Sequence, residues 1–592
     1  MSTLDEKAEF YSSEEDVVAV DGTQSGVRRI EAIQSVWGTK SKIALWVSVA
    51  LASYMYILDN GTNWAWGSYA TIQFGHYQQF AAIQCATSIL LAIGKPLFAK
   101  LTDAAGRAEA IAFALFFYVL GYIINATTPN MVGLGAGSCI WVLGFSGLQI
   151  ALQIVIADVS TLRWRPIISS LSTGGWYFIN FYANGQITAK LTGPGGAGWR
   201  WGYGIYAMCY IPALTPIIFV LLWAQRRARA QGALAGVEPE AEAKPPFATR
   251  AREFLQEVDA VGLFFLAATL ALIFLPIVLA GGSYATTTWK DPAIPAMMVI
   301  GGVVTLPAFI YWETKRATHP VIPWRLLRNR TILAGCTINF FDFVSFYLTY
   351  GQLYGFVSAT TQWKISNLIY YSNCQSLSLT FFGLGWAIIA GKFKTGYKWS
   401  LVAALAIRIF GVALMFYARA HQNTAALVMT QIIQGLGGGI AAVASQIGAQ
   451  GAVPHQDVAL ATAALLLSAE VGGVVGTAAA GAIWNNRLPV EIAKHLPQLN
   501  STEIAGYVGA PTLVRLLTGE EYTQMLSAYA STMRILLIPG VVIAIIPFAA
   551  AFFVKDFRLL EIQNAVEVKT LDGKRAQNAG ESIEPEVLDA KV

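Results

Sequence analysis

The sequence predicts an all-α polytopic membrane protein with about fourteen transmembrane helices. Apolar stretches long enough to cross a bilayer follow one another from Ile43 to Val554, and most of the polar breaks between them are short. The composition agrees, because 55% of the residues are hydrophobic and only 13% are charged, whereas soluble domains carry about 25% charged residues. Little chain is left for a catalytic domain, so we expect a transporter of solutes and not an enzyme.

The expected spans follow from the length of each apolar stretch, since about 20 helical residues cross the hydrocarbon core. They cover residues 43–66, 78–98, 109–126, 132–156, 170–191, 203–223, 260–281, 293–313, 331–358, 366–391, 398–420, 425–449, 458–483 and 531–554. The polar tails, 1–42 and 555–592, are expected to be disordered and cytosolic. The acidic start of the chain is unlike a cleavable signal peptide. Two tails on one side require an even number of spans.

The distribution of basic residues orients these spans. Loops on the proposed cytosolic side hold most of the lysines and arginines, whereas the short loops opposite hold about one each, as the positive-inside rule requires. The long segment 224–259 is predicted to be a flexible cytosolic linker. The other long segment, 484–530, faces outward and is expected to fold as short helices. It contains Asn500-Ser501-Thr502, an acceptor sequence for N-glycosylation, although an unmodified asparagine is an equal alternative.

Short sequences throughout the membrane region resemble one family of transporters. The loop AKLTDAAGR (99–107) resembles the cytosolic loop of the major facilitator superfamily, although Ala99 and Ala108 replace a glycine and a basic residue of that pattern. Further fragments are YILDNGT (56–62), FGH (74–76), KP (95–96), IADV (156–159), LRWR (162–165), GWRWG (198–202), PVIPWRLL (320–327), QGLGGG (434–439) and PHQDVA (454–459). Together they resemble the fungal siderophore–iron transporters, which are facilitators with fourteen spans.

The resemblance implies a major facilitator fold in a 6+2+6 arrangement. Two six-helix bundles, 43–223 and 331–554, would flank two linker helices, 260–313. A cytosolic latch would involve Asp103, Arg107, Asp158 and Arg163. The resemblance also implies that a monomer imports an iron chelate by alternating access, driven by the proton gradient.

Charges inside spans are candidates for function, because each costs at least about 2.5 kcal/mol to insert. Asp59 and Asp342 occupy corresponding places in the first helix of each bundle, and Glu470 lies in the thirteenth span. A carboxyl group that faces the central cavity can take up a proton outside and release it inside, so these three are the candidates for proton coupling. The alternative is a fixed ion pair that holds helices together, which also suits Arg408.

Aromatic residues crowd the first, fifth, ninth and tenth spans. Rings supply contact area and phenolic hydroxyls form hydrogen bonds, which suits a large neutral ligand rich in amides, such as a hydroxamate siderophore. The alternative is that many of these rings face lipid. The candidate substrate-binding residues are Tyr56, Trp66, Tyr69, Trp176, Tyr177, Asn180, Phe343, Tyr347, Tyr350, Tyr354 and Tyr370.

Cofactors and resident metals are not expected, because the siderophore itself saturates the iron and the sequence has no cluster of metal ligands. A net charge of +5 is too small and too dispersed for nucleic acid. Haem or glutathione remain alternative cargoes, and Tyr507 and Tyr522 in the outward loop offer ligands for haem. A drug/proton antiporter and a membrane protein that transports nothing are further alternatives. We expect the plasma membrane, with endosomal or vacuolar membranes as the alternative.

Overall fold

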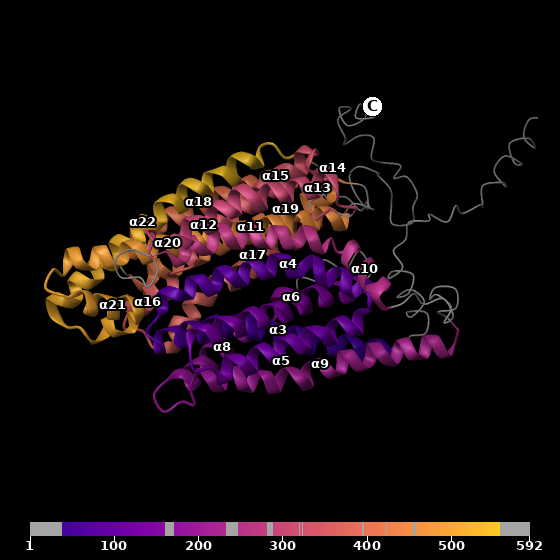
Figure 1. Cartoon of the computed structure of the whole chain (residues 1–592), viewed down its shortest axis with the longest axis horizontal. Coiled ribbons are helices and arrows are strands. Elements are labelled where there is room, and N and C mark those ends of the chain that lie inside the picture. Colours follow the sequence, from indigo (N-terminus) through magenta and orange to yellow (C-terminus); the bar gives the residue numbers. More distant parts are fainter. Residues whose placement is uncertain are drawn as a thin grey trace, which may run out of the picture.

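The computed structural model describes residues 38–159, 171–232, 247–280, 288–318, 320–321, 324–393, 396–421, 423–453 and 458–556. Within these ranges every regular element is a helix, so the predicted all-α class is confirmed. The long helices run roughly side by side along the length of the molecule (Figure 1). These helices form two groups, which are described in turn below.

The first group contains six helices, and their small and aromatic faces are buried against one another. They are α3 (Thr39–Gln73), α4 (Phe80–Ala104), α5 (Arg107–Thr127), α6 (Met131–Val159), α8 (Tyr177–Thr192) and α9 (Trp199–Ala230). A short π-helical segment, Leu171–Gly175, precedes α8. In this N-terminal bundle α5 packs against α6 and α9, while α3 packs against α8 and α9.

The second group repeats the arrangement with the later helices. They are α15 (Arg330–Tyr350) with its continuation α16 (Leu353–Thr360), α17 (Ile365–Phe393), α18 (Tyr397–His421), α19 (Thr424–Gly451), α20 (Val458–His495) and α22 (Gly519–Ala551). In this C-terminal bundle α15 packs against α20 and α22, and α19 packs against α17 and α18. The short helix α14 (Trp324–Leu327) precedes it. The predicted span 331–358 is therefore interrupted, since Gly351 and Gln352 separate α15 from α16.

Between the bundles lie a short helix, α10 (Phe247–Glu257), and two longer ones. The first is α11 (Ala260–Leu279), and the second is built from α12 (Ala293–Val299), a π-helical turn (Ile300–Thr305) and α13 (Leu306–Lys315). Helix α11 contacts both α4 and α20, one helix from each bundle. The linker pair therefore packs along one side of the junction between the bundles.

The segment expected as an outward loop, 484–530, is largely helical. Helix α20 continues to His495 and α22 already begins at Gly519, and between them lie α21 (Ser501–Gly509) and a 3-10 turn (Pro511–Leu516). At 1.5 Å per residue α20 is about 57 Å long, which exceeds a hydrocarbon core of about 30 Å. Both helices continue past the apolar stretch because Trp484 and Tyr529 pack edge to face, 5.7 Å between centroids, and are fully buried. Helices α16 and α21 lie at one end of the molecule, called the outer end below (Figure 1).

Twelve helices in the described chain are long and apolar enough to cross a membrane. Helices α8 and α17 correspond to the other two predicted spans, 170–191 and 366–391, but do not meet that criterion. These two helices pack against each other across the junction of the bundles. Helix α8, with 16 residues, is shorter than the 18 residues that the criterion requires. A count of fourteen spans is compatible with this arrangement and stays a prediction.

A close approach of α17 and α19 provides a test of this packing. A Cβ atom added to Gly439 would lie 2.2 Å from the carbonyl oxygen of Leu379. Gly439→Ala is therefore expected to separate the two helices and to destabilise the fold by about 1–3 kcal/mol. The melting temperature of the detergent-solubilised protein should fall. Gly385→Ala is the matched control, because nothing lies within 4 Å of its added Cβ, and it should leave the melting temperature unchanged or slightly raised.

Candidate functional site

A cavity of about 300 Å³ lies between the two bundles. It is walled by α3, α4, α6, α8 and α9 on one side and by α15, α16 and α17 on the other. Ten of its lining residues carry rings: Trp64, Phe80, Trp141, Phe145, Tyr177, Tyr203, Phe346, Tyr347, Tyr350 and Tyr354. Nine carry neutral polar groups: Asn60, Asn63, Gln84, Thr87, Ser88, Ser138, Ser372, Asn373 and Ser376.

None of the described residues that line the cavity has a charged side chain. A charged group buried among these lining residues would therefore lack a counter-charge from them. Aromatic faces supply contact area, while amides and hydroxyls supply hydrogen bonds in both directions.

Hydrogen bonds position several of these groups. The Nδ2 of Asn60 donates to the hydroxyl of Tyr177 at 2.6 Å. The Nδ2 of Asn373, on α17, donates to the backbone oxygen of Gly61, on α3, at 3.2 Å, which joins the two bundles across the cavity. The hydroxyl of Tyr350 donates to the backbone oxygen of Ser372 at 3.0 Å. The wall is thus held in a defined arrangement before any ligand binds.

Four of the predicted substrate-binding residues line the cavity, namely Tyr177, Tyr347, Tyr350 and Tyr354. The other seven do not. Tyr56 stacks on Phe145, a lining residue, with centroids 4.7 Å apart. Tyr69 contacts the lining ring of Tyr354 edge to face, and Phe343 contacts that of Tyr347 at a tilt.

The remaining four do not line the cavity either. Trp66 is fully buried against two rings of α9, of which one, Tyr203, lines the cavity. Trp176 packs edge to face on Tyr54. Asn180 donates to the backbone oxygen of Tyr54 at 3.2 Å. Tyr370 accepts a hydrogen bond from Gln186 at 2.8 Å between α17 and α8.

Sequence reasoning gave little weight to the polar stripe of α4 that lines the cavity. Gln84, Thr87 and Ser88, together with Phe80 and Leu91, all line it, and they recur at the three- and four-residue spacing of one helix face. The signal that identifies them is a polar stripe on an otherwise apolar span. A search for charged and aromatic residues alone overlooks it.

Asp59 lies in a cage of tyrosines behind the cavity wall. The hydroxyl of Tyr118 donates to its Oδ2 at 2.8 Å, and the hydroxyl of Tyr122 donates to its Oδ1. The hydroxyl of Tyr210 in turn donates to that of Tyr118 at 3.1 Å. Asp59 is fully buried, and the described residues place no lysine or arginine in an ion pair with it. Tyr122 packs against Trp141, a lining residue, so one layer of rings separates the carboxyl group from the cavity.

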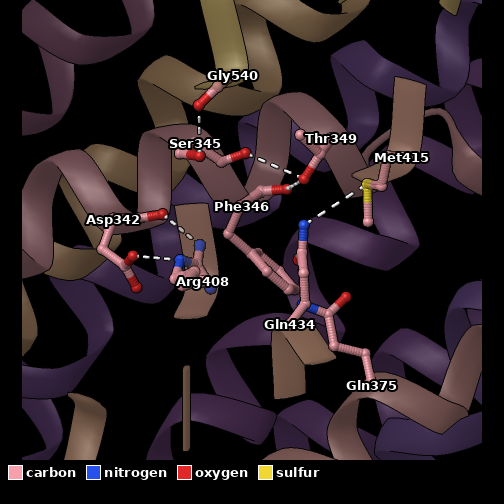
Figure 2. Close-up of polar contacts among 9 residues, drawn as sticks. All are labelled: Asp342, Ser345, Phe346, Thr349, Gln375, Arg408, Met415, Gln434 and Gly540. Carbon is pink, nitrogen blue, oxygen red and sulfur yellow. Dashed lines mark hydrogen bonds and ion pairs between the residues drawn. The ribbon is translucent and has the colours of Figure 1, made fainter. Parts of the chain in front are cut away.

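Asp342 has a different environment, since it forms an ion pair with Arg408 between α15 and α18 (Figure 2). The same guanidinium donates to the backbone oxygen of Asp342 at 2.9 Å. Arg408 is only 3% exposed. This contact favours the alternative in which the pair holds two helices of one bundle together.

Glu470 forms an ion pair with Lys95, which joins α20 of one bundle to α4 of the other. The two side chains are only 11% and 12% exposed. Lys95 lies one helical turn beyond Leu91, the last residue of α4 to line the cavity. The pair therefore joins the two bundles next to the cavity. Lys95 lies inside the predicted span 78–98 but is missing from the candidate charges above.

Breaking this pair should be costly, because removal of one partner leaves the other charge buried. Lys95→Ala and Glu470→Ala are each expected to lower the free energy of unfolding by about 3–5 kcal/mol. The double variant should recover part of the loss, since no unpaired charge remains. A double-mutant cycle on the melting temperature measures the coupling. Additive effects of the two substitutions would argue against a working ion pair.

The predicted cytosolic latch falls partly within the described residues. The Nε of Arg107 lies 3.1 Å from the Oδ2 of Asp158, which joins α5 to α6, and its Nη1 donates to the backbone oxygen of Thr102 at 3.1 Å. Gly106, with φ of 117°, makes the turn that brings α5 back against α4. Arg163 and the side chain of Asp103 lie outside the described part of the chain.

Tyr507 and Tyr522 belong to the outer end and not to the cavity. The hydroxyl of Tyr522 donates to the backbone oxygen of Thr360 at 3.3 Å, and the backbone oxygen of Tyr507 accepts from the hydroxyl of Tyr529 at 3.2 Å. Partial burial, and then the carboxylates of Glu521 and Glu503, raise the pKa of Tyr507 above its ordinary value. Within the described residues no group of three His, Cys, Asp or Glu side chains is placed to hold a metal ion.

Three similar proteins match almost the whole chain. A siderophore transporter of Mycosarcoma maydis is 30% identical over 96% of this chain and 89% of its own length. A siderochrome iron transporter of Aspergillus fumigatus is 31% identical over 93% and 89%. A low-affinity haem transporter of Schizosaccharomyces pombe is 29% identical over 96% and 91%. A scan of protein-family models found none that matches.

Solved structures share the fold at low sequence identity. A peptide transporter crystallised with sulfate matches with a TM-score of 0.54 and 13% identity, over 89% of this chain and 99% of that one. A bacterial homologue of the lysosomal transporter Spinster, inward-facing and unoccupied, matches with a TM-score of 0.50 and 14% identity, over 88% and 98%. These likenesses concern the arrangement of helices and not the cargo.

Proposed function

Because this chain belongs to the fungal siderophore–iron transporter family of the major facilitator superfamily, we propose that it imports a neutral ferric siderophore of the hydroxamate type. Uptake proceeds by alternating access, is driven by the inward proton gradient, and takes place in the plasma membrane. A single chain forms the whole path, since both walls of the cavity come from its own two bundles.

The observation that carries this proposal is the uncharged lining of the cavity. Three hydroxamate groups, each with one negative charge, neutralise a ferric ion and fill its coordination sphere. The resulting chelate presents carbonyl and amide groups on a neutral surface. Asparagine amides and hydroxyls of the wall can donate to those oxygens, and the tyrosine and tryptophan rings cover the rest. Iron therefore travels as part of the substrate and needs no ligand from the protein.

We assign this arrangement to an occluded state of the transport cycle, because contacts join the bundles on both sides of the cavity. Its volume of about 300 Å³ is at the small end for a ligand site, so the bundles must part to admit a bulky chelate. The Nδ2 of Asn485, on α20, donates to the backbone oxygen of Gln78 at 3.1 Å and so joins the bundles near the outer end. The pair of Lys95 and Glu470 joins them on the other side. Alternate opening of these two sets of contacts exposes the cavity to one side at a time.

Asp59 is the residue that best suits proton coupling. Its carboxyl group is buried with hydroxyl partners and without a cation, so binding a proton removes a costly buried charge. Helix α3 bears both this group and the cavity residues Asn60, Asn63 and Trp64. Movement of α3 as the bundles rock would therefore alter the proton site and the substrate site together.

Other cargoes fit the lining less well. Haem carries two propionates, and glutathione carries more than one carboxylate, and both would meet a wall without cations. A drug antiporter that exports organic cations would likewise lack a counter-charge. One of the similar proteins is a haem transporter, so uptake of haem must be measured separately from uptake of siderophores.

Uptake of radioactive iron tests the proposal. The chain is expressed in yeast without siderophore transporters of its own, and ferrichrome-type, fusarinine-type, coprogen-type and ferrioxamine chelates are supplied with or without a protonophore. We expect accumulation of at least one of these chelates, and we expect the protonophore to abolish it. Accumulation of none of them would refute the substrate class, and accumulation indifferent to the protonophore would refute proton coupling.

A further inference from the structure

We propose that Asn500 carries an N-linked glycan. The sequence contains four acceptor sequences of the form Asn-Xaa-Ser/Thr, which begin at Asn60, Asn125, Asn329 and Asn500. An acceptor must be exposed and must face the non-cytosolic side. The proposal rests on the orientation given by the basic residues and is independent of the cargo.

The geometry at Asn500 leaves the reactive atom accessible. Asn500 is the N-cap of α21, where its Oδ1 accepts from the backbone N–H of Glu503 at 2.9 Å. The Oε2 of Glu503 accepts from the backbone N–H of Asn500 at 2.8 Å. This capping box uses the amide oxygen and leaves Nδ2, to which a glycan is attached, without a partner among the described residues. Asn500, Ser501 and Thr502 are all exposed.

The inward face of the same helix explains why the acceptor points away from the protein. Ile504 and Val508 are buried against the outer ends of α20 and α22. Asn500 precedes the first turn of α21, on the chain that arrives from α20. A glycan at this position would extend into solvent and would leave the hydrogen bonds of the capping box in place.

The other three acceptor sequences are unsuitable. Asn60 lies inside α3 and lines the cavity between the bundles. Asn125 is only 1% exposed, near the end of α5. Asn329 is the N-cap of α15 at the end predicted to be cytosolic, and its Nδ2 donates to the backbone oxygen of Ala452 at 3.0 Å. Asn500 is therefore the single site that combines exposure with a free Nδ2.

The modification is a group transfer from a lipid-linked oligosaccharide pyrophosphate. A bond forms between Nδ2 of Asn500 and the anomeric carbon of the first sugar, while the bond from that carbon to the pyrophosphate oxygen breaks. Nδ2 loses one proton and the lipid pyrophosphate leaves. Thr502 supplies the hydroxyl that the acceptor sequence requires.

Two substitutions separate glycosylation from folding. Asn500→Asp keeps an oxygen that can cap α21 but removes Nδ2, and Thr502→Ala removes the hydroxyl without touching the capping box. Thr502→Ser is the matched control, because it keeps the acceptor sequence. The full-length tagged protein is expressed in yeast, treated with an endoglycosidase that removes N-linked glycans, and compared on an immunoblot.

We expect the wild-type and Thr502→Ser proteins to shift by a single step on treatment. Asn500→Asp and Thr502→Ala should already run at the position of the treated protein, and a fluorescent tag should report normal amounts at the cell surface. The proposal would be overturned if the wild-type protein ran at the same position before and after treatment, or if treatment still shifted Thr502→Ala. Iron uptake measured in the same cells should be unchanged in all variants, so failure here and failure of the proposed transport are distinguishable.

Discussion

Asp59→Asn is expected to abolish the accumulation of chelated iron against its gradient, while the protein reaches the membrane in normal amounts. The asparagine keeps the size of the side chain, and its one amide oxygen can still accept from one of the two hydroxyls, of Tyr118 and Tyr122, that donate to Asp59. It cannot bind and release a proton. The cavity is untouched, because Asp59 does not line it. Exchange of labelled for unlabelled chelate across the membrane should therefore survive, since exchange needs no net movement of protons.

Two measurements decide this prediction: uptake under a proton gradient and counterflow without one. Asp342→Asn is the contrasting variant, because it leaves Arg408 buried without its carboxylate partner. There we expect a lower melting temperature, as the loss of one member of a buried pair costs about 3–5 kcal/mol. Accumulation that survives in Asp59→Asn would show that the proton binds elsewhere, with Glu470 as the next candidate.

Asn63→Asp should reduce uptake of a neutral chelate about tenfold or more, because desolvating a charged group costs at least about 1–3 kcal/mol and about 1.4 kcal/mol corresponds to a factor of ten. Asn63 lines the cavity, and the substitution changes the charge with almost no change in shape. Bound substrate would cover the new carboxylate and deprive it of water.

The control for this experiment is Asn63→Ala, which truncates the same side chain without adding a charge. It should lower uptake much less than Asn63→Asp. Initial rates of uptake at equal surface expression make the comparison. Equal losses in the two variants would mean that the amide contributes a specific contact and that the neutrality of the wall does not matter.

Hydropathy and resemblance predicted the class and the family, and both are confirmed. Single apolar stretches of sufficient length specify spanning helices almost without tertiary context, because backbone polar groups must be satisfied within each helix. Hydropathy does not predict how a helix packs against its neighbours in the folded protein. Helices α8 and α17 do not meet the criterion for a spanning helix, and they pack against each other between the bundles. Helices α20 and α22 continue beyond their apolar stretches, where Trp484 and Tyr529 pack against each other at the outer end.

The site was less predictable than the fold. An intramembrane carboxylate such as Asp59 is conspicuous in a sequence, but its cage comes from α5 and α9, and nothing in the sequence around Tyr118 or Tyr210 indicates that neighbour. The faces that line the cavity depend on how each helix is rotated within its bundle. Tyr347, Tyr350 and Tyr354 face it, whereas Trp66, from an equally aromatic span, is packed inside one bundle.

The central claim is that a wall without charge selects a neutral ferric chelate. The most direct test compares initial rates of iron uptake from a neutral ferric trihydroxamate, an anionic ferric tricatecholate and haem, in the same yeast cells and at the same concentration. We predict uptake of the trihydroxamate, sensitive to a protonophore, and no uptake of the other two above cells that lack the protein. Uptake of the tricatecholate or haem at a rate equal to or above that of the trihydroxamate would contradict it.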